Sequence, residues 1–280
     1  MSFAPAANGV RLYYEETGTG YPIIFVHEFA SDHREWETQV RFFSREYHCI
    51  TYNARGYSPS DVPTDPAHYG QDAAVDDIAS VLKHLKITKA HVVGLSMGAF
   101  ATLRFGLKHP SMASALVVAG CGGGSIPGQL ETWRATQKER SNHLEREGWG
   151  KHARETAEGP SRVRLRQKDP RGYEEFVGHL EQHSVVGSAL TQRRYQGERD
   201  PVQAWEADLK NMQVPTLLAL GDEDEPCIEA NIFLKRTLPN SGLWMYPRTG
   251  HAINLEEPAA FNRAVRDFFG SVERGRWIPK

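Results

Sequence analysis

A serine flanked by two glycines is the clearest candidate for chemistry in this chain. Gly94, Ser96 and Gly98 form the pattern G-x-S-x-G within the stretch HVVGLSMGAF. The apolar run before the serine predicts a buried strand, and the residues after it predict a helix. A tight turn between them would leave no room for side chains at the two glycine positions and would present the hydroxyl as a nucleophile at the edge of a sheet. A plain glycine-rich turn is the alternative.

The serine needs a base, because a hydroxyl is a poor nucleophile until its proton is removed. His251 is the best placed of the twelve histidines, since it follows the strand-like run LWMYPR and precedes the last predicted helix. An exposed loop histidine is the alternative. The imidazole in turn needs an acid, and the loop GDEDEP offers Asp222, Glu223, Asp224 and Glu225. We favour Asp224 as the acid, although the spacing alone leaves the choice open.

Short apolar runs predict the strands that would position these side chains. They cover residues 9–18, 22–28, 48–55, 90–96, 114–120, 215–222 and 243–248. Apolar residues at helical spacing lie between the runs, as in Val75, Ile78, Leu82 and Leu85, and in the helix predicted from Pro258 through Phe261, Val265, Phe268 and Phe269. Strands that alternate with helices predict an α/β protein with a mostly parallel sheet covered on both sides.

The alternation stops between about residues 125 and 208. This stretch is polar, rich in Arg, Glu and Gln, and helical in tendency. It is too long for a loop. We therefore predict a helical cap over residues 125–208, inserted into a core formed by residues 1–124 and 209–280.

Composition limits the classes of partner. The chain of 280 residues carries 33 Lys and Arg against 35 Asp and Glu, so it offers no electrostatic footprint for nucleic acid or an anionic membrane. No apolar run approaches the roughly 18–20 residues of a membrane span, and no signal peptide is visible. Three separated cysteines form no disulfide framework or zinc spacing. We expect a cytoplasmic protein that needs no metal or other cofactor and binds a small-molecule substrate. A homodimer is left open.

Five motifs in order resemble the α/β-hydrolase superfamily over nearly the whole chain. They are FVHEF, NARGYSPSD, GLSMG, GDEDEP and PRTGHAINLEEP, and the order serine, aspartate, histidine is that of the superfamily. The resemblance implies the α/β-hydrolase fold: an eight-stranded, mostly parallel sheet flanked by helices, with a helical cap after the sixth strand. In the family's pattern the acid is the second aspartate of G-x-x-D, which also selects Asp224.

The resemblance also implies an oxyanion hole made of two backbone amides. One would belong to Met97, directly after the serine, and the other maps to Phe29. Phe29 lies two places past His27, in a motif that usually reads H-G-x. We interpret His27 as a residue that braces this loop.

Glu28 replaces the usual glycine of that motif. A carboxylate here could disfavour the oxyanion, discourage anionic substrates, bind a cationic substrate group or assist proton transfer. The simplest interpretation is that Glu28 turns away and bonds to nearby backbone or to Arg55. Glu28, His27 and Leu95 are the candidate residues for the substrate pocket.

Three other patterns carry weaker signals. HLEQH places His179 and His183 one turn apart on a helix, but Glu181 points to the far side and no third metal ligand is evident. The basic run over residues 162–171 could hold an anionic group over the pocket, whereas a solvated helix face is the default. AGCGGGS, over residues 119–125, fits the entry to the cap better than a dinucleotide loop.

We expect a serine hydrolase that cleaves a carboxylic ester or lactone of a small organic substrate through an acyl-enzyme. Ser96 would attack, His251 would act as base and then acid, and Asp224 would orient His251. One alternative keeps the triad for carbon–carbon bond hydrolysis, perhydrolysis or a lyase step, although GLSMG and GHA differ from the G-N-S-M-G and G-H-W often seen in carbon–carbon hydrolases. Another is a cofactor-free oxygenase. A third is a receptor-like protein that binds a ligand without turnover.

Overall fold

The computed structural model describes residues 1–159 and 162–279, and in them eight strands form one sheet in the order β1-β2-β4-β3-β5-β6-β7-β8. Strands β3 to β8 pair in parallel, while β1 with β2 and β2 with β4 pair antiparallel. The predicted eight-stranded, mostly parallel sheet is therefore confirmed. The strands are β1 (Ser2–Pro5), β2 (Arg11–Thr17), β3 (Tyr21–Val26), β4 (Tyr47–Tyr52), β5 (Ala90–Leu95), β6 (Ala113–Ala119), β7 (Thr216–Gly221) and β8 (Ser241–Tyr246).

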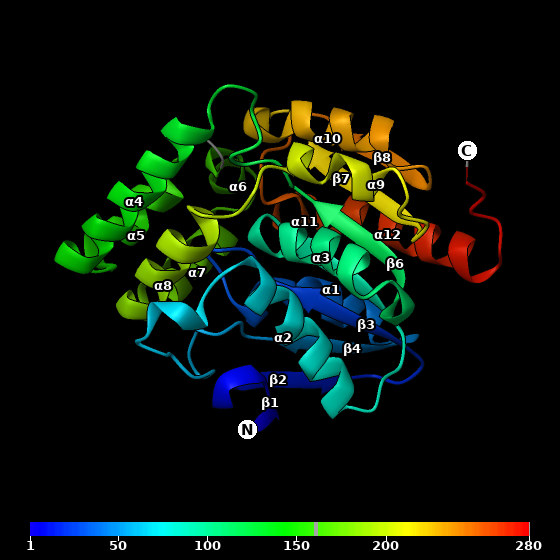
Figure 1. Ribbon diagram of the computed structural model, residues 1–280, viewed down its shortest axis with the longest axis horizontal. Helices are drawn as coiled ribbons and strands as arrows, with labels where there is room; N and C mark the ends of the chain where they lie inside the picture. Colours follow the sequence, from blue (N-terminus) through cyan, green and yellow to red (C-terminus); the bar gives the residue numbers. More distant parts are fainter. Residues whose placement is uncertain (160–161, 280) are drawn as a thin grey trace.

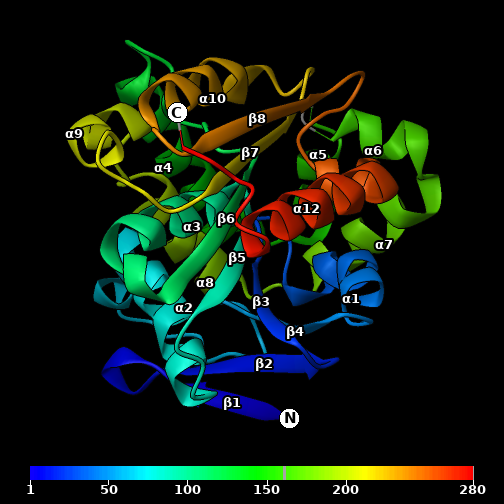
Figure 2. The ribbon, with the colours of Figure 1, turned by 90° about the vertical axis from the view of Figure 1, so that its right-hand side faces the viewer.

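Helices cover both faces of the sheet (Figure 2). Consecutive strand residues point to opposite faces, so Ile23 and Val93 belong to one core cluster while Ile24 and Val92 belong to the other. This two-sided burial explains why the central strands read as unbroken apolar runs. One face is covered by α2 (Gln71–His84), α3 (Met97–Lys108) and α10 (Glu225–Thr237), and the other by α1 (Glu37–Phe43) and α12 (Pro258–Glu273).

The chain between β6 and β7 forms helices of its own. Helices α4, α5, α7 and α8 lie beside one another at one end of the molecule, away from the sheet (Figure 1). They share a separate apolar cluster that includes Leu144, Trp149 and Phe176, whereas Trp205 packs with the core beside α3. In order the elements are α4 (Leu130–Glu147), α5 (Gly150–Ala157), α6 (Val163–Lys168), α7 (Pro170–Glu181), α8 (Val185–Leu190), the π-helical η5 (Thr191–Gln196), η6 (Val202–Trp205) and α9 (Glu206–Leu209).

The loops that follow the parallel strands all meet at one edge of the sheet, because parallel strands end on the same side. The loops after β3, β5, β7 and β8 carry Glu28, Ser96, Asp224 and His251 respectively. The remaining elements are short: η1 (Ala7–Gly9), η2 (His33–Trp36), η3 (Pro66–His68), η4 (Pro110–Met112) and α11 (Ile253–Glu256). Within the described residues, none of the helices is both long and apolar enough to cross a membrane.

Candidate active site

Ser96 lies on a strained turn between β5 and α3. Its φ is 54° and its ψ is −113°, a left-handed conformation that side chains rarely adopt outside functional sites. Its amide donates to the carbonyl of Ala119 at 2.8 Å. A Cβ on Gly94 would overlap the carbonyl oxygen of Gly98, and a Cβ on Gly98 would overlap that of Val26. Both glycines are thus required by close backbone approach, as the sequence predicts.

The structure brings His251 and Asp224 together. Nδ1 of His251 lies 2.8 Å from Oδ2 of Asp224, so the ring donates from Nδ1 and keeps Nε2 as an acceptor. Burial disfavours the charged imidazole, but the Asp224 carboxylate outweighs it and, with Glu28, raises the pKa of His251 above its ordinary value. Burial likewise opposes ionisation of Asp224, and His251 overcomes this and lowers the pKa of the carboxyl. Each member of the pair therefore favours the charged form of the other.

Ser96 and His251 line the same cavity, whose volume is about 550 Å³. Both residues lie near the end of β6. The Ser96 amide donates to the carbonyl of Ala119, the last residue of β6. A Cβ placed on the next residue, Gly120, would lie 3.2 Å from Cε1 of His251. In the described part of the chain no hydrogen bond joins the Ser96 hydroxyl to the imidazole. Such bonds are commonly loose without substrate and tighten in the complex.

Of the two residues predicted to supply oxyanion amides, Phe29 lines this cavity and Met97 directly follows Ser96. Met97 is the first residue of α3, where an amide has no partner within the helix. The carbonyl of Met97 accepts from the Tyr195 hydroxyl at 2.8 Å, and the carbonyl of Phe29 accepts from the Tyr57 hydroxyl at 2.8 Å. Neither amide donates to a protein acceptor within residues 1–159 and 162–279.

Glu28 points into the cavity and forms a buried ion pair with Arg162, which directly precedes α6. Its side chain is 2% exposed. The interpretation that Glu28 turns away toward backbone or Arg55 is wrong, because Arg55 is bonded in a bidentate way to Asp77 at 2.6 and 2.8 Å. Behind Glu28, burial and then the Glu28 charge raise the pKa of Glu35 well above its ordinary value.

His27 and Leu95 do not line this cavity, so their prediction as pocket residues is wrong. Leu95 is the last residue of β5, and its side chain is fully buried in the core. His27 is 1% exposed and sits between two backbone partners: Nδ1 donates to the carbonyl of Glu28 at 2.7 Å, and Nε2 accepts from the amide of Ala54 at 3.0 Å. Burial lowers the pKa of His27 to about 4. The neutral ring braces the loop, as the sequence interpretation had it.

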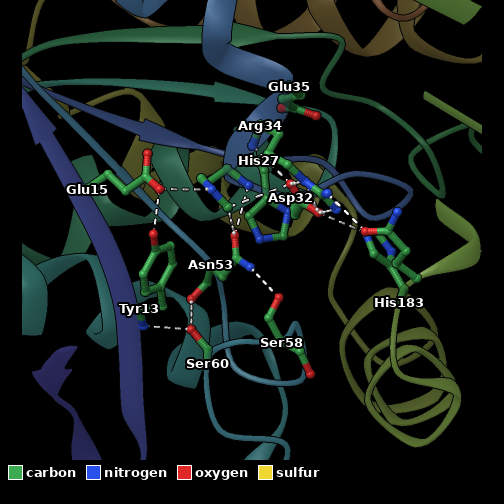
Figure 3. Close-up of polar contacts among 12 residues, drawn as sticks. Tyr13, Glu15, His27, Asp32, Arg34, Glu35, Asn53, Ser58, Ser60 and His183 are labelled. Atoms are coloured by element: carbon green, nitrogen blue, oxygen red, sulfur yellow. Dashed lines mark hydrogen bonds and ion pairs between the residues drawn. The ribbon is translucent and has the colours of Figure 1, made fainter. Parts of the chain in front are cut away.

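A polar network fixes the same loop further along. Figure 3 shows Asp32 between Arg34 and His183, and Nε2 of His183 lies 3.3 Å from Oδ2 of Asp32. Arg34 also donates to Gln182 at 3.0 Å. His183 thus ties the loop that carries Glu28 and Phe29 to the end of α7. No cluster with a third metal ligand includes His179 and His183 among the described residues.

Part of the basic run over residues 162–171 docks onto the core, whereas Arg166 and Arg171 are exposed and pair with Glu158 and Glu175. Besides the pair of Arg162 with Glu28, Arg164 forks onto Glu223, and Lys168 contacts Glu257 at 2.6 Å. The solvated helix face that is the default interpretation therefore holds for Arg166 and Arg171 and fails for Arg162 and Arg164. The charges of Arg162, Arg164 and Lys168 face carboxylates on loops of the core, which no local sequence pattern reveals.

A further part of the cavity wall comes from α4, η5 and the residues after η5, and sequence reasoning missed this part. These residues are Trp133, Gln137, Arg140, Gln192, Gln196 and Arg199. None belongs to an apolar period, and polar residues on a helical segment carry no local sign of an inward orientation. A π-helical turn, which is often found at functional sites, places Gln192 and Gln196 here.

Two groups of described residues have ligand atoms close enough to hold a metal ion. One is His143, His152 and Glu155 on α4 and α5. The other is Asp224, Cys227 and His251, in which the Cys227 thiol donates to the carbonyl of Gly120 at 3.3 Å. Hydrogen bonding already engages the second group, and burial raises the pKa of Cys227 well above its ordinary value. We therefore interpret Asp224 and His251 as an acid–base pair, with the protonated thiol of Cys227 beside them.

Comparison with known proteins agrees with this geometry. A family model described as alpha/beta hydrolase fold matches residues 21–258. The chain is 25% identical over 245 residues to 3-oxoadipate enol-lactonase 2 of Acinetobacter baylyi, covering 87% of this chain and 86% of that one. It is 23% identical to 2-hydroxy-6-oxo-2,4-heptadienoate hydrolase of Pseudomonas putida, covering 95% of each. A solved esterase of Thermogutta terrifontis with malate bound superposes with a TM-score of 0.86 at 25% identity, covering 97% of this chain and 98% of that one.

Proposed function

Because the chain belongs to the alpha/beta hydrolase fold family and is a hydrolase of that family, we propose that it cleaves a carboxylic ester or a lactone of a small organic substrate through an acyl-enzyme on Ser96. The observation that carries the proposal is the buried pair of His251 and Asp224, at 2.8 Å, in the cavity that Ser96 lines. Two unengaged amides beside the serine complete the parts that acyl transfer needs.

In the first step Ser96 Oγ attacks the carbonyl carbon while Nε2 of His251 takes the hydroxyl proton. A carbon–oxygen bond forms and the carbonyl π pair moves onto oxygen, where the amides of Phe29 and Met97 stabilise the charge. Asp224 stabilises the imidazolium. Collapse of the intermediate breaks the bond to the leaving oxygen, which receives the proton from His251.

Water then completes the cycle by the same route. His251 takes a proton from water, and the hydroxide oxygen adds to the acyl carbon. The bond to Ser96 breaks, and the proton returns to its oxygen. One water is consumed, and the products are an acid and an alcohol, or a single hydroxy acid when the substrate is a lactone.

Turnover of a substrate panel tests the proposal. We expect p-nitrophenyl esters of rising acyl length and small lactones to include substrates that the wild type hydrolyses. Ser96→Ala should lower kcat/KM by about a thousandfold or more, because a triad member has no substitute. A matched control is Ser80→Ala, which removes a hydroxyl bonded to a helix carbonyl on α2. A loss of only a few-fold in Ser96→Ala would contradict the proposal.

A further inference from the structure

Arg199 is a buried cation without an acidic partner. Its side chain is 6% exposed and lines the cavity that holds Ser96 and His251. Nη2 donates to the carbonyl of Gly123 at 2.7 Å. The guanidinium lies over Phe100, 3.8 Å from the ring centroid, and 5.3 Å from the centroid of Trp133. Within residues 1–159 and 162–279 no carboxylate forms an ion pair with it.

Among the residues that line this cavity, Arg199 and Gln137 have buried hydrogen-bond donors without acceptors, and Gln196 has a buried oxygen without a donor. Nε and Nη1 of Arg199 are buried and form no hydrogen bond with any described atom. The same holds for Nε2 of Gln137. The Gln137 oxygen accepts from Gln192, which fixes the direction of the Gln137 amide. Donors left unpaired in a buried site cost free energy, and buried donors in native proteins nearly always have a partner.

Elsewhere in the lining of this cavity, the Arg162 guanidinium already has a carboxylate partner, Glu28. A buried guanidinium over aromatic rings is only partly compensated by them. Burial lowers the pKa of Arg199 to about 10, so the cation persists at neutral pH. The planar fork of a guanidinium matches the two oxygens of a carboxylate.

We propose that Arg199 and Gln137 bind a carboxylate of the substrate, so that the preferred substrates are esters or lactones that carry a free carboxylate away from the scissile bond. This inference rests on the proposed function for the chemistry, but the binding site itself does not require it. The carboxylate enters the Arg199 end, and the scissile carbonyl lies at Ser96.

Two matched esters test the inference. We would compare p-nitrophenyl hydrogen adipate with its neutral counterpart, methyl p-nitrophenyl adipate, on the wild type, Arg199→Met and Arg199→Lys. We expect the wild type to prefer the anionic ester by kcat/KM. The ratio of the two kcat/KM values should fall about tenfold or more in Arg199→Met, since a charge-assisted bond is lost, and less in Arg199→Lys. Arg104→Met is the control. Arg104 is a residue of α3 whose guanidinium also lies over an aromatic ring, that of Trp205, but it does not line this cavity.

Binding without turnover separates this inference from the proposed function. Adipate should bind Ser96→Ala, and the affinity should fall in Ser96→Ala/Arg199→Met, as measured by calorimetry and by the fluorescence of the adjacent Trp133. If no ester is hydrolysed but adipate binding still depends on Arg199, the subsite stands and ester hydrolysis fails. If esters are hydrolysed with no preference for the anionic one, or if the ratio survives Arg199→Met, the subsite is overturned and ester hydrolysis stands.

Discussion

The two sides of the cavity each hold a buried arginine, and their partners differ. Arg162 reaches from the start of α6 to Glu28, which lies beside the oxyanion amides. Arg199 follows η5 and meets two aromatic rings and one backbone carbonyl, with no carboxylate among the described residues. Both side chains are under one tenth exposed.

Because of this difference, we assign the Arg162 charge a role in stability and the Arg199 charge a role in ligand binding. Removing one member of a buried ion pair leaves the other uncompensated, which is strongly destabilising. Removing a buried cation that has no anionic partner also removes its desolvation cost. The Arg162 side therefore holds the inserted helices onto the core, and the Arg199 side selects what the cavity binds.

The largest effect expected from this comparison is on stability. Arg162→Met should lower the free energy of unfolding by about 3 kcal/mol, because Glu28 is left buried without its partner. Arg199→Met should leave that free energy unchanged or raise it. Urea unfolding followed by fluorescence measures both. The double variant Glu28→Gln/Arg162→Met is the matched control and should regain most of the loss. Equal destabilisation by the two single methionine variants would remove the distinction between the sides.

A smaller effect is expected on the pH dependence of turnover. The neutral imidazole of His251 is the base, and Asp224 and Glu28 raise its pKa, so the acid limb of kcat/KM should lie above the ordinary histidine value of about 6.5. Glu28→Gln removes one of the negative charges, which lowers the pKa and shifts that limb downward by roughly half a pH unit. A pH profile with a neutral ester measures the midpoint.

The midpoint does not depend on the fraction of active enzyme, so a partly destabilised variant is still informative. Glu37→Gln on the surface of α1 serves as the control, since it removes the same charge far from His251. A shift of the limb to higher pH in Glu28→Gln would contradict the assigned electrostatics.

The smallest effect concerns the exposed end of the same basic run. Arg164 pairs with Glu223 nearer the solvent, where ion pairs contribute little and salt screens them. Arg164→Gln should leave the thermal midpoint unchanged within error at moderate salt. A large drop, comparable with that of Arg162→Met, would show that burial does not decide which pairs hold α6 in place.

Local pattern predicts the central strands and the main core helices, because each central strand is buried on both faces and each of these helices presents one apolar stripe. The helices through Val75 and Phe261 and the turn at Ser96 follow directly from such patterns and are confirmed. Strand β1 was not found from pattern, because four residues that end in proline give too short a signal. The resemblance to the superfamily supplied the eighth strand.

The sequence predicts those site residues whose positions follow from where the strands end. Strand ends place Ser96, Asp224 and His251 on one edge, whereas Leu95 was assigned to the pocket although its strand position turns it into the core. The partners of Glu28 and Arg199 could not be predicted, since Glu28 and Arg162 are 134 residues apart and a buried arginine has the same local sequence as a solvated one. Long-range packing decides both.

Trapping the acyl-enzyme is the most direct test of the central claim that Ser96 is the nucleophile. Wild type mixed with a p-nitrophenyl ester that it hydrolyses, then quenched in acid within the first turnover, should gain the mass of one acyl group, and peptide mapping should place that group on Ser96. His251→Ala should form the adduct far more slowly, and Ser96→Ala should form none. An adduct on another residue, or hydrolysis that continues at the wild-type rate in Ser96→Ala, would contradict the account.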